Sequence, residues 1–498
     1  MYLSNLKSFV TYIVLGIGLI LFSMTYYPRY KQGGGEATIS WDVSGYYWYL
    51  PALFIYKDLK NLQFSDSLRN AYSCSADNQQ ITYLPDGKKV LKYSSGMALQ
   101  FLPFFAIAHS LAKPLGYEAD GLSPPYQFAI HIGALLMCLF GLWFLRKLLL
   151  QYFKDSTVAW VLFFLIVGTN YLNYAAIDVG MSHAWLFSLY CLLFYLTDHF
   201  YKSSSYKTAI KIGFVLGLLV LSRPTELIAI IIPLLWGVNL LSLSSIQNRI
   251  QVFVKHWRIY LVSIVTMITI GSLQIIYWKY STGNWLVYSY GDQNFSWLHP
   301  HLFLYTIHFK NGWLIYCPMM ILPYIGFLCL TKKKEIFWPI FIFSAAFLWI
   351  VSAWDIWDYG GRAMIQSYVA LMFPLASLIE YVETKWPLRI IFFGFAFLFT
   401  YLNIWWVHGI HRGGSIYTSE MSKAYYLKTV GRWNINEQDR KLLDISDDYS
   451  GKILDADTLL HYQFNQSKPN EALINHTTCL YLQSDSSVYT NFIVPKPN

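Results

Sequence analysis

Long apolar stretches, separated by loops that alternate in charge, constrain this chain more than any other feature of its sequence. A stretch of about twenty apolar residues has the length of a helix that crosses a bilayer. About eleven such spans are predicted, at 9–27, 126–145, 156–175, 181–199, 208–222, 225–241, 258–279, 312–330, 335–353, 363–382 and 388–407. The sequence therefore predicts an all-α polytopic membrane protein with about eleven transmembrane helices.

The composition agrees with this class. Only 13% of the residues are charged and 55% are hydrophobic, whereas about a quarter of a soluble domain is charged. The 40 tyrosines and 19 tryptophans suit helix ends at the level of the lipid headgroups, and also a cavity for an amphipathic ligand. A net charge of +9 would suggest nucleic acid in a soluble protein. Here basic cytoplasmic loops explain it, so we expect membrane lipids as surroundings and no nucleic-acid partner.

The basic residues of the short loops predict the orientation of the helices. Every second loop is basic, and the five basic loops carry Arg146, Lys147 and Lys154; Lys202, Lys207 and Lys211; Arg249, Lys255 and Arg258; Lys332, Lys333 and Lys334; and Lys385 and Arg389. The alternate loops at 177–182, 280–312 and 354–361 contain almost no lysine. Because basic loops stay in the cytoplasm, the alternate set is predicted to face outward.

This orientation divides the chain into a membrane domain, 1–407, and an outward tail or small cap, 408–498. The first span lacks a small-residue cleavage site before Pro28 and is predicted to be a retained helix. A long outward loop, 28–95, follows it, and Met97–Ala112 is predicted to be an interfacial or re-entrant helix. Cys74 and Cys479 both fall in outward segments, and whether they pair is left open.

Asp42 is the most informative polar residue of the long loop. It lies about a dozen residues beyond the first span, in the aromatic segment Trp41-Asp-Val-Ser-Gly-Tyr-Tyr, which also contains Tyr46. A carboxylate buried beside aromatic rings binds a proton more tightly, which suits a base and is costly for a residue without a function. An ordinary loop aspartate is the alternative.

Charged residues of the other outward segments are the remaining candidates. Each also has an ordinary structural role open to it. Asp178 would cap a helix, and His183 would hydrogen-bond a carbonyl. Arg223 would reach lipid phosphates, and Lys92 would anchor the chain at the membrane–water interface. Arg362, in Trp357-Asp-Tyr-Gly-Gly-Arg, is predicted at a helix N-terminus, where an anion is favoured, so phosphate binding is the preferred interpretation. Asp355 and Asp358 are its alternative partners.

Carboxylates beside cations at one membrane face suit a transfer reaction. A base removes a proton from a hydroxyl or amine, while cations hold a departing phosphate. The sequence contains no glycine-rich nucleotide loop, and nucleotide donors are not found outside the cytoplasm, so no nucleotide cofactor is expected. The natural donor on that face is a lipid-linked phosphate.

Several motifs in order along the chain resemble a known family. They are Trp41-Asp-Val-Ser-Gly-Tyr-Tyr, Lys92-Tyr-Ser-Ser-Gly-Met-Ala, Gly168-Thr-Asn-Tyr, Gly180-Met-Ser-His, Arg223-Pro-Thr, Tyr277-Trp-Lys-Tyr-Ser-Thr-Gly, Tyr288-Ser-Tyr-Gly, Asn311-Gly-Trp-Leu-Ile-Tyr-Cys-Pro and Trp357-Asp-Tyr-Gly-Gly-Arg. With these motifs the chain resembles the C-type (GT-C) glycosyltransferases related to protein O-mannosyltransferases and lipid A aminoarabinose transferases. It is most similar to a bacterial branch of that set.

The resemblance implies a role for each candidate. Asp42 would be the catalytic base and Lys92 would hold the lipid phosphate. Asp178 would be a second acid of the site, with Arg362 or Arg223 contacting the phosphate and His183 and Tyr46 in the binding site. Some relatives use a divalent metal, and Asp42, Asp178 and His183 have residue types that could share one. The family's paired acidic dipeptide is absent, because Val43 follows Asp42, and this weakens any transfer of the protein O-mannosyltransferase specificity.

The resulting hypothesis is an inverting transfer of a sugar from a polyprenyl-phosphate donor to an envelope acceptor, which is a lipid, a glycan or a protein. It would take place at the periplasmic face of a bacterial inner membrane. The main alternative is a transporter or flippase of lipid-linked glycan, which needs cations but no base. A polysaccharide polymerase or ligase usually has its large loop late in the chain, whereas here it comes early. A structural scaffold would not need acids and cations gathered at one face.

Overall fold

The computed structural model describes most of the chain. The described residues are 5–75, 79–291, 293–310, 312–355, 359–418 and 420–444, with the backbone of 474–475 and 478–479. Residues 1–444 form one compact unit and residues 445–498 a second. In the second unit, β3 (Ile474–Asn475) pairs antiparallel with β4 (Thr478–Cys479). The side chain of Cys479, and with it the pairing with Cys74, lies outside the described residues.

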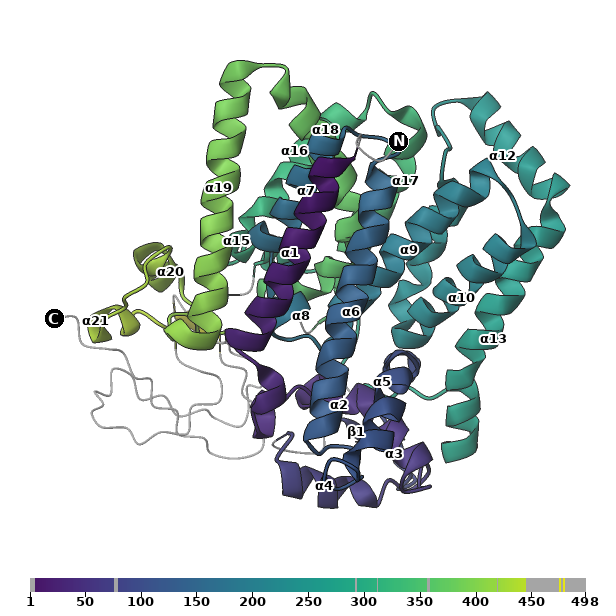
Figure 1. Ribbon diagram of the computed structural model, residues 1–498, viewed down its shortest axis with the longest axis vertical. Coiled ribbons are helices and arrows are strands. Elements are labelled where there is room, and N and C mark those ends of the chain that lie inside the picture. The colour runs from purple at the N-terminus through teal and green to yellow at the C-terminus, as the bar shows by residue number, and fades with distance from the viewer. Residues whose placement is uncertain are drawn as a thin grey trace, which may run out of the picture. The chain divides into compact units, whose positions relative to one another are not determined.

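Helices make up most of the first unit (Figure 1). Its longer apolar helices are α1 (Leu6–Thr25), α6 (Pro124–Leu149), α7 (Asp155–Gly168), α9 (Ser182–Lys202), α10 (Tyr206–Ser222), α13 (Trp257–Thr282), α16 (Ile321–Leu330), α17 (Lys334–Ala353), α18 (Tyr368–Glu383) and α19 (Trp386–His408). Among the described residues, six helices are long and apolar enough to cross a membrane by themselves. The chain is therefore a multi-pass membrane protein, as its sequence predicted.

The other predicted spans are short or interrupted, and some differ from the prediction. The span 312–330 is broken into α15 (Trp313–Tyr316), η4 (Pro318–Met320) and α16, because Pro318 has no amide hydrogen with which to continue a helix. The span 156–175 is divided between α7 and α8 (Tyr171–Ala176). The span 225–241 is η3 (Pro224–Ile230) followed by α11 (Ile231–Leu235), which ends before residue 241.

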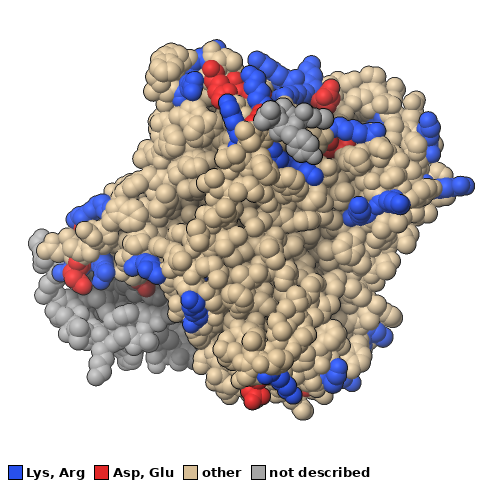
Figure 2. All heavy atoms as spheres, in the orientation of Figure 1, with Lys and Arg blue, Asp and Glu red and all other residues tan. Residues whose placement is uncertain are grey.

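The loops gather at two opposite ends, as the charge alternation predicted. At one end three basic loops meet, because the Lys333 ammonium donates to the carbonyl of Tyr152 at 2.8 Å and the amide of Lys154 to Glu380 at 2.9 Å. Figure 2 shows lysines and arginines concentrated at this end, with a broad, nearly uncharged belt below it. The amphipathic helix α12 (Leu243–Lys255) precedes α13.

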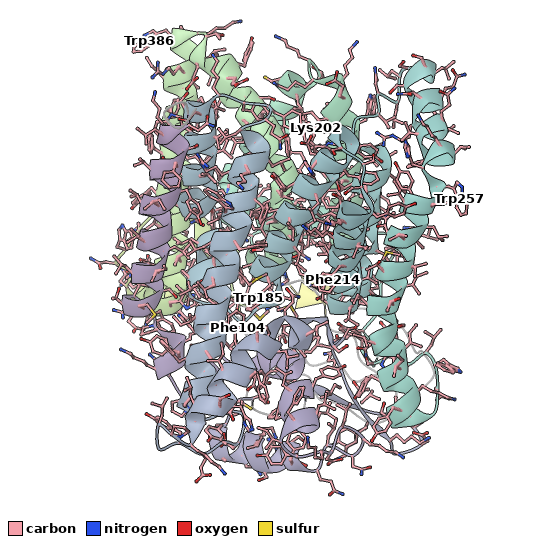
Figure 3. All side chains as sticks on the ribbon, turned by 45° about the vertical axis from the view of Figure 1, so that its right-hand side comes forward. Phe104, Trp185, Lys202, Phe214, Trp257 and Trp386 are labelled. Atoms are coloured by element: carbon pink, nitrogen blue, oxygen red, sulfur yellow. The ribbon has the colours of Figure 1, made fainter. Side chains whose placement is uncertain are left out.

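The opposite end, called the α2 end here, carries the long first loop (Figure 1). Its elements are η1 (Arg29–Lys31), η2 (Gly34–Glu36), α2 (Trp41–Tyr47), α3 (Tyr49–Phe54), α4 (Phe64–Tyr72), β1 (Ile81–Tyr83), β2 (Lys89–Leu91) and α5 (Gly96–Ala112). The two strands form an antiparallel hairpin in which Ile81 pairs with Leu91. Trp185 and Phe104 pack with ring centroids 6.0 Å apart toward this end, while Lys202 lies toward the other end of α9 (Figure 3).

The compact unit extends beyond residue 407, where the sequence analysis placed the end of the membrane domain. Residues after α19 form η6 (Gly409–Gly413), α20 (Lys423–Thr429) and α21 (Glu437–Arg440). The Tyr426 hydroxyl donates to the carbonyl of Ile315 and the Trp405 indole to that of Arg432. These contacts explain the extension, because they attach the segment to the helices. The remaining elements are α14 (Leu302–Ile307) and η5 (Tyr359–Ser367).

Two glycines of α10 allow it to pack closely against α13. Gly213 and Gly217 are four residues apart and lie on the same face of α10. A β-carbon at Gly213 would lie 2.2 Å from the carbonyl oxygen of Ser263, and one at Gly217 would lie 2.6 Å from Ile270. Two small residues at this spacing let membrane helices approach closely.

Candidate active site

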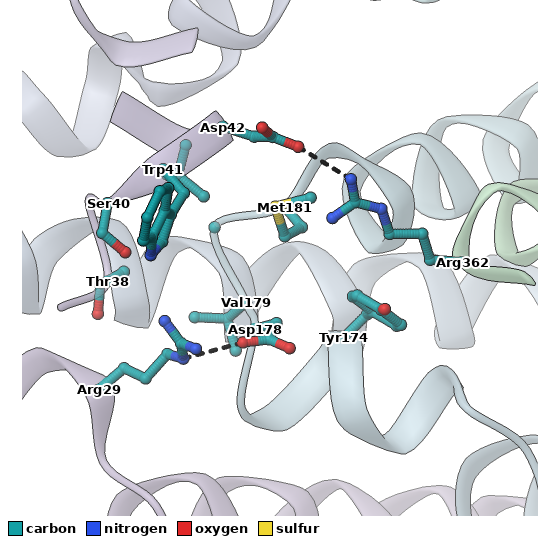
Figure 4. Close-up of a pocket in the computed structure, with 12 residues that line it drawn as sticks. Arg29, Thr38, Ser40, Trp41, Asp42, Tyr174, Asp178, Val179, Met181 and Arg362 are labelled. Carbon is teal, nitrogen blue, oxygen red and sulfur yellow. Dashed lines mark hydrogen bonds and ion pairs between the residues drawn. The ribbon is translucent and has the colours of Figure 1, made fainter. Parts of the chain in front are cut away.

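A cavity of about 240 Å³ lies at the α2 end (Figure 4). Three segments that are far apart in the sequence form its wall: the connection from α1 into α2, the connection between α8 and α9, and η5. Its lining residues are Arg29, Thr38, Ser40, Trp41, Asp42, Val43, Tyr174, Asp178, Val179, Gly180, Met181 and Arg362. The cavity thus brings together Asp42, Asp178 and Arg362, three of the residues that the sequence singled out.

Asp42 lies in the first turn of α2 and uses its two carboxylate oxygens differently. Oδ1 accepts a hydrogen bond from the Tyr93 hydroxyl at 2.7 Å. Oδ2 pairs with the Arg362 guanidinium at 3.0 Å. The Asp42 side chain remains 26% exposed, so the carboxylate is held in place without being closed off. A carboxylate that accepts from a phenol and a guanidinium is held with strong, directional contacts.

The backbone directly before Asp42 is strained. Trp41 has φ = 44°, a left-handed conformation that costs a bulky residue roughly 1–3 kcal/mol. Its amide donates to the carbonyl of Cys74 at 2.9 Å, and its carbonyl accepts from the Ser44 hydroxyl. These two contacts hold the conformation in place. Strain of this kind concentrates at functional sites, and here it sets where α2 begins and therefore where Asp42 points.

Lys92 is held beside Asp42 through aromatic rings. It follows β2, and its ammonium lies 5.7 Å from the ring centroids of both Tyr93 and Tyr290. The backbone is fixed on two sides, because the Lys92 amide donates to Gln80 and its carbonyl accepts from Ser289. Within the described part of the chain, no carboxylate lies within ion-pair distance of this ammonium. The Lys92 ammonium therefore lies over the rings of Tyr93 and Tyr290, and the Tyr93 hydroxyl contacts Asp42.

Tyr46 lies one turn after Asp42 and is buried. Its ring packs against that of Tyr93 with centroids 4.6 Å apart. Burial raises the pKa of the Tyr46 phenol, the Asp42 charge raises it further, and the charges of Arg223 and Arg362 oppose this rise. The Tyr46 phenol therefore stays neutral at neutral pH.

Asp178 is ion-paired and does not cap α9. Its Oδ1 pairs with Arg29 at 2.9 Å and its Oδ2 accepts from the Asn173 amide at 2.7 Å. Burial raises the pKa of Asp178, but the Arg29 charge, His411, the Asn173 hydrogen bond and Arg362 together hold it below its ordinary value. Asp178 is therefore a carboxylate at neutral pH. The helix-cap alternative is wrong, because α9 has Met181 at its N-cap and no side-chain cap.

Arg223 and His183 form a second polar group next to the cavity. The Arg223 guanidinium lies 3.4 Å from Nδ1 of His183, and the same nitrogen lies 3.1 Å from the Gln366 amide oxygen. The Gln366 nitrogen donates to Glu226, which also accepts from the Tyr190 hydroxyl at 2.6 Å. These contacts connect Arg223 to buried polar groups of the helix bundle, so its guanidinium is directed into the protein.

Comparison with known proteins identifies the fold. No family model matches the sequence, and no curated protein sequence matches it either. Among solved structures, ArnT (a lipid A aminoarabinose transferase) from Cupriavidus metallidurans in the apo state superimposes with a TM-score of 0.50 at 12% identity, over 84% of this chain and 69% of that one. The chain has the GT-C fold.

Two further GT-C structures match with lower scores. ArnT from Cupriavidus metallidurans bound to undecaprenyl phosphate has a TM-score of 0.45 and 13% identity, over 77% of this chain and 63% of that one. The Archaeoglobus fulgidus oligosaccharyltransferase in the apo form has a TM-score of 0.45 and 12% identity, over 86% and 59% of the two chains. At such identities the likeness concerns the fold alone, so function has to be argued from the site.

The three candidate metal ligands do not come together in the part of the chain that the structure describes. In the described residues, no group of three or more histidine, cysteine, aspartate or glutamate side chains is placed to hold a metal ion. Asp42, Asp178 and His183 each contact a different partner, namely Arg362, Arg29 and Gln366. In the described structure these three residues are therefore not placed to share a metal ion.

Several residues of the site escaped the sequence analysis. Arg29 pairs with Asp178, and Tyr93 binds Asp42. Two sequence signals could have found them. Tyr93 directly follows Lys92, and Arg29 lies just beyond the first span, on the outward side, where few basic residues are expected. Asp355 is not a described partner of Arg362, since it pairs with His301 at 3.2 Å and accepts from Ser296. Asp358 lies outside the described residues.

Proposed function

We propose that this GT-C chain transfers a sugar from a polyprenyl-phosphate donor to an acceptor of the cell envelope, with inversion at the anomeric carbon. The observation that carries the proposal is the position of Asp42. Its carboxylate lies at the wall of a cavity, held by Tyr93 and Arg362, with the Lys92 ammonium on the adjoining rings. A base next to cations is the arrangement that proton removal coupled to phosphate departure requires.

The donor would lie on the lysine side of Asp42. Its phosphate would bind the Lys92 ammonium, which has no described carboxylate partner to displace. Arg362 would divide its donors between Asp42 and the phosphate, because a guanidinium carries five N–H groups. Arg223, whose guanidinium contacts His183, would add a further positive charge to this end of the protein.

The reaction then balances in one displacement. An acceptor hydroxyl attacks the anomeric carbon while the bond from that carbon to the phosphate oxygen breaks. The hydroxyl proton moves to Asp42, and the bonding electron pair leaves with the phosphate, which Lys92 and Arg362 stabilise as its negative charge grows. A single attack from the face opposite the leaving group inverts the anomeric centre. The face of the membrane is proposed to be the outer face of a bacterial inner membrane.

The test uses full-length protein in lipid nanodiscs with polyprenyl-phosphate sugars and an acceptor extract from bacterial envelopes. We expect sugar transfer and release of polyprenyl phosphate, and a rate at least about 100-fold lower for Asp42→Asn. Asp86→Asn is the matched control, because Asp86 is an acid of the same loop that pairs with Lys88 and lies away from the cavity lining. Equal transfer by wild type and Asp42→Asn contradicts the proposal.

A flippase of lipid-linked glycan is the other candidate, and the same preparations separate the two. A flippase would move the lipid-linked glycan across vesicles, release no polyprenyl phosphate, and keep its activity in Asp42→Asn because it needs no base. NMR of the product's anomeric configuration tests inversion separately.

A further inference from the structure

The two carboxylate oxygens of Asp42 face different surroundings. Oδ1 contacts Tyr93, whose ring and that of Tyr290 carry Lys92. Oδ2 contacts Arg362, which lines the cavity, whereas Lys92 and Tyr290 are not among the lining residues. Asp42 thus lies between a cationic, aromatic side and the cavity, with Arg362 at the border of the two. If the first side takes the donor phosphate, the cavity is left for the group that Asp42 deprotonates.

We propose that this cavity is the acceptor site and that it binds a carbohydrate, with the Trp41 indole as the surface on which a sugar ring stacks. The proposal rests on the proposed transferase function and goes beyond it, because it names the chemical class of the acceptor. It makes Trp41 a binding and specificity residue of this chain.

Trp41 is presented to the cavity rather than buried. The residue is 43% exposed, although the preceding residues and the rest of α2 are largely buried. The indole lies against Gly35, where a β-carbon would lie 2.7 Å from the indole nitrogen. A side chain at position 35 would therefore collide with the indole, and Gly35 leaves room for it. Core packing does not explain an exposed tryptophan with a strained backbone, and its position in the lining of a cavity is what a binding surface requires.

The rest of the wall supplies the polar groups that sugar hydroxyls need (Figure 4). The Ser40 hydroxyl donates to the carbonyls of Gly35 and Ala37 at 2.8 Å, so toward the cavity it can only accept. The ion pair of Arg29 and Asp178 offers donors and acceptors together. Vicinal hydroxyl groups each donate and accept, so a paired cation and anion match them well.

The size of the cavity and the shape of a sugar agree with this assignment. At about 240 Å³ the cavity is smaller than the roughly 300–1,000 Å³ of sites for drug-sized ligands, which favours one ring over a peptide side chain with its flanking backbone. A pyranose ring has a face of C–H groups that are weakly positive, and the indole has a negative π face. Asp42 lines the same cavity as Trp41, so a sugar stacked on the indole would lie in the space that the Asp42 carboxylate borders.

Binding of simple sugars tests the assignment without requiring transfer. Saturation-transfer NMR would be recorded for the full-length protein in nanodiscs with methyl glucoside, methyl galactoside, methyl mannoside and methyl N-acetylglucosaminide. We expect at least one to bind, and Trp41→Ala to weaken it about threefold to tenfold. Trp41→Phe should retain most of the binding, and Gly35→Ala should reduce it by displacing the indole. Trp285→Ala is the matched control, because Trp285 is also exposed but lies outside the cavity lining.

Kinetics give the second measurement and separate the two proposals. In transfer assays, Trp41→Ala should raise the acceptor KM and leave the donor KM unchanged, with the melting temperature as a check of folding. The inference is overturned if no sugar binds the wild type, if Trp41→Ala binds as well as Trp285→Ala, or if only peptides accept the sugar. Transfer to peptides that is lost in Asp42→Asn would leave the proposed function standing. Sugar binding that depends on Trp41, without transfer from any donor, would overturn the function alone.

Discussion

Two ends of the bundle each place an aspartate beside a tyrosine and a cation, yet the two arrangements differ in access. At the α2 end, Asp42 contacts Tyr93 and Arg362 and is 26% exposed. At the opposite end, Asp198 within α9 accepts from Tyr152 and from the Trp236 indole and pairs with Lys202 at 2.7 Å. The Asp198 side chain is only 3% exposed.

The comparison shows that residue types alone do not make a site. Asp198 lies in regular helix and is enclosed by its partners, so its contacts stabilise the fold. Asp42 follows a strained residue and lines a cavity, so part of its surface is available to a ligand. The lysines differ in the same way, because Lys202 is paired with Asp198 whereas Lys92 rests on aromatic rings.

The largest expected effect separates the two acids by activity. Asp42→Ala should lower the transfer rate at least about 100-fold, because it removes the base. Asp198→Ala should change the rate per folded molecule by no more than about twofold, because Asp198 lies at the other end of the bundle. Initial rates normalised to folded protein measure this. Comparable losses in the two variants would mean that the ends are not distinct in function.

Stability should show the reverse order. Asp198→Ala leaves the Tyr152 hydroxyl and the Trp236 indole without their acceptor, which costs about 1–3 kcal/mol per buried group. Asp42→Ala should cost less, because Arg362 is partly exposed and can reach water. Thermal unfolding in matched nanodiscs compares them. A larger loss of stability for Asp42→Ala would break the distinction.

The two lysines should differ in donor binding. Lys92→Ala should raise the donor KM about tenfold or more, which corresponds to the loss of about one charge-assisted contact to phosphate. Lys202→Ala should leave the donor KM unchanged, because that ammonium is bound to Asp198 and Gln151. Lys89→Ala is a nearer control, since Lys89 belongs to the same hairpin and lies over Tyr83. An unchanged donor KM in Lys92→Ala removes Lys92 from the phosphate site.

The smallest effect concerns pH and the second acid of the cavity. The pKa of Asp178 is held below its ordinary value of 3.8. The unfolded chain therefore takes up a proton at a higher pH than the folded chain. The Arg29 pair should contribute its full stability above about pH 3.8 and lose it as the pH falls through the lower, folded value. Unfolding temperatures of wild type and Asp178→Asn should converge at acid pH, and a constant difference would contradict this.

Much of the architecture follows from local sequence. Apolar length and loop charge predicted the helices and their alternation, because both depend on a few adjacent residues and on the bilayer. The same reasoning missed the break at Pro318 within 312–330. The apolar pattern continues through this proline, but the helical hydrogen bonding does not. The candidate residues Asp42, Asp178 and Arg362 were chosen from loops expected on one side, and the structure places all three on one cavity. Their catalytic and binding roles stay predictions.

The class of protein, the approximate spans and the end at which the polar candidates gather follow from the sequence alone. The partners of these candidates follow from the packing of the helices. Asp42 and Arg362 are 320 residues apart along the chain, and Arg29 and Asp178 also come from different segments. Periodicity and loop charge act over a few turns of helix, whereas these pairs depend on how whole helices pack. The left-handed backbone of Trp41, which directs α2 into the cavity, is likewise held by a contact to the distant Cys74.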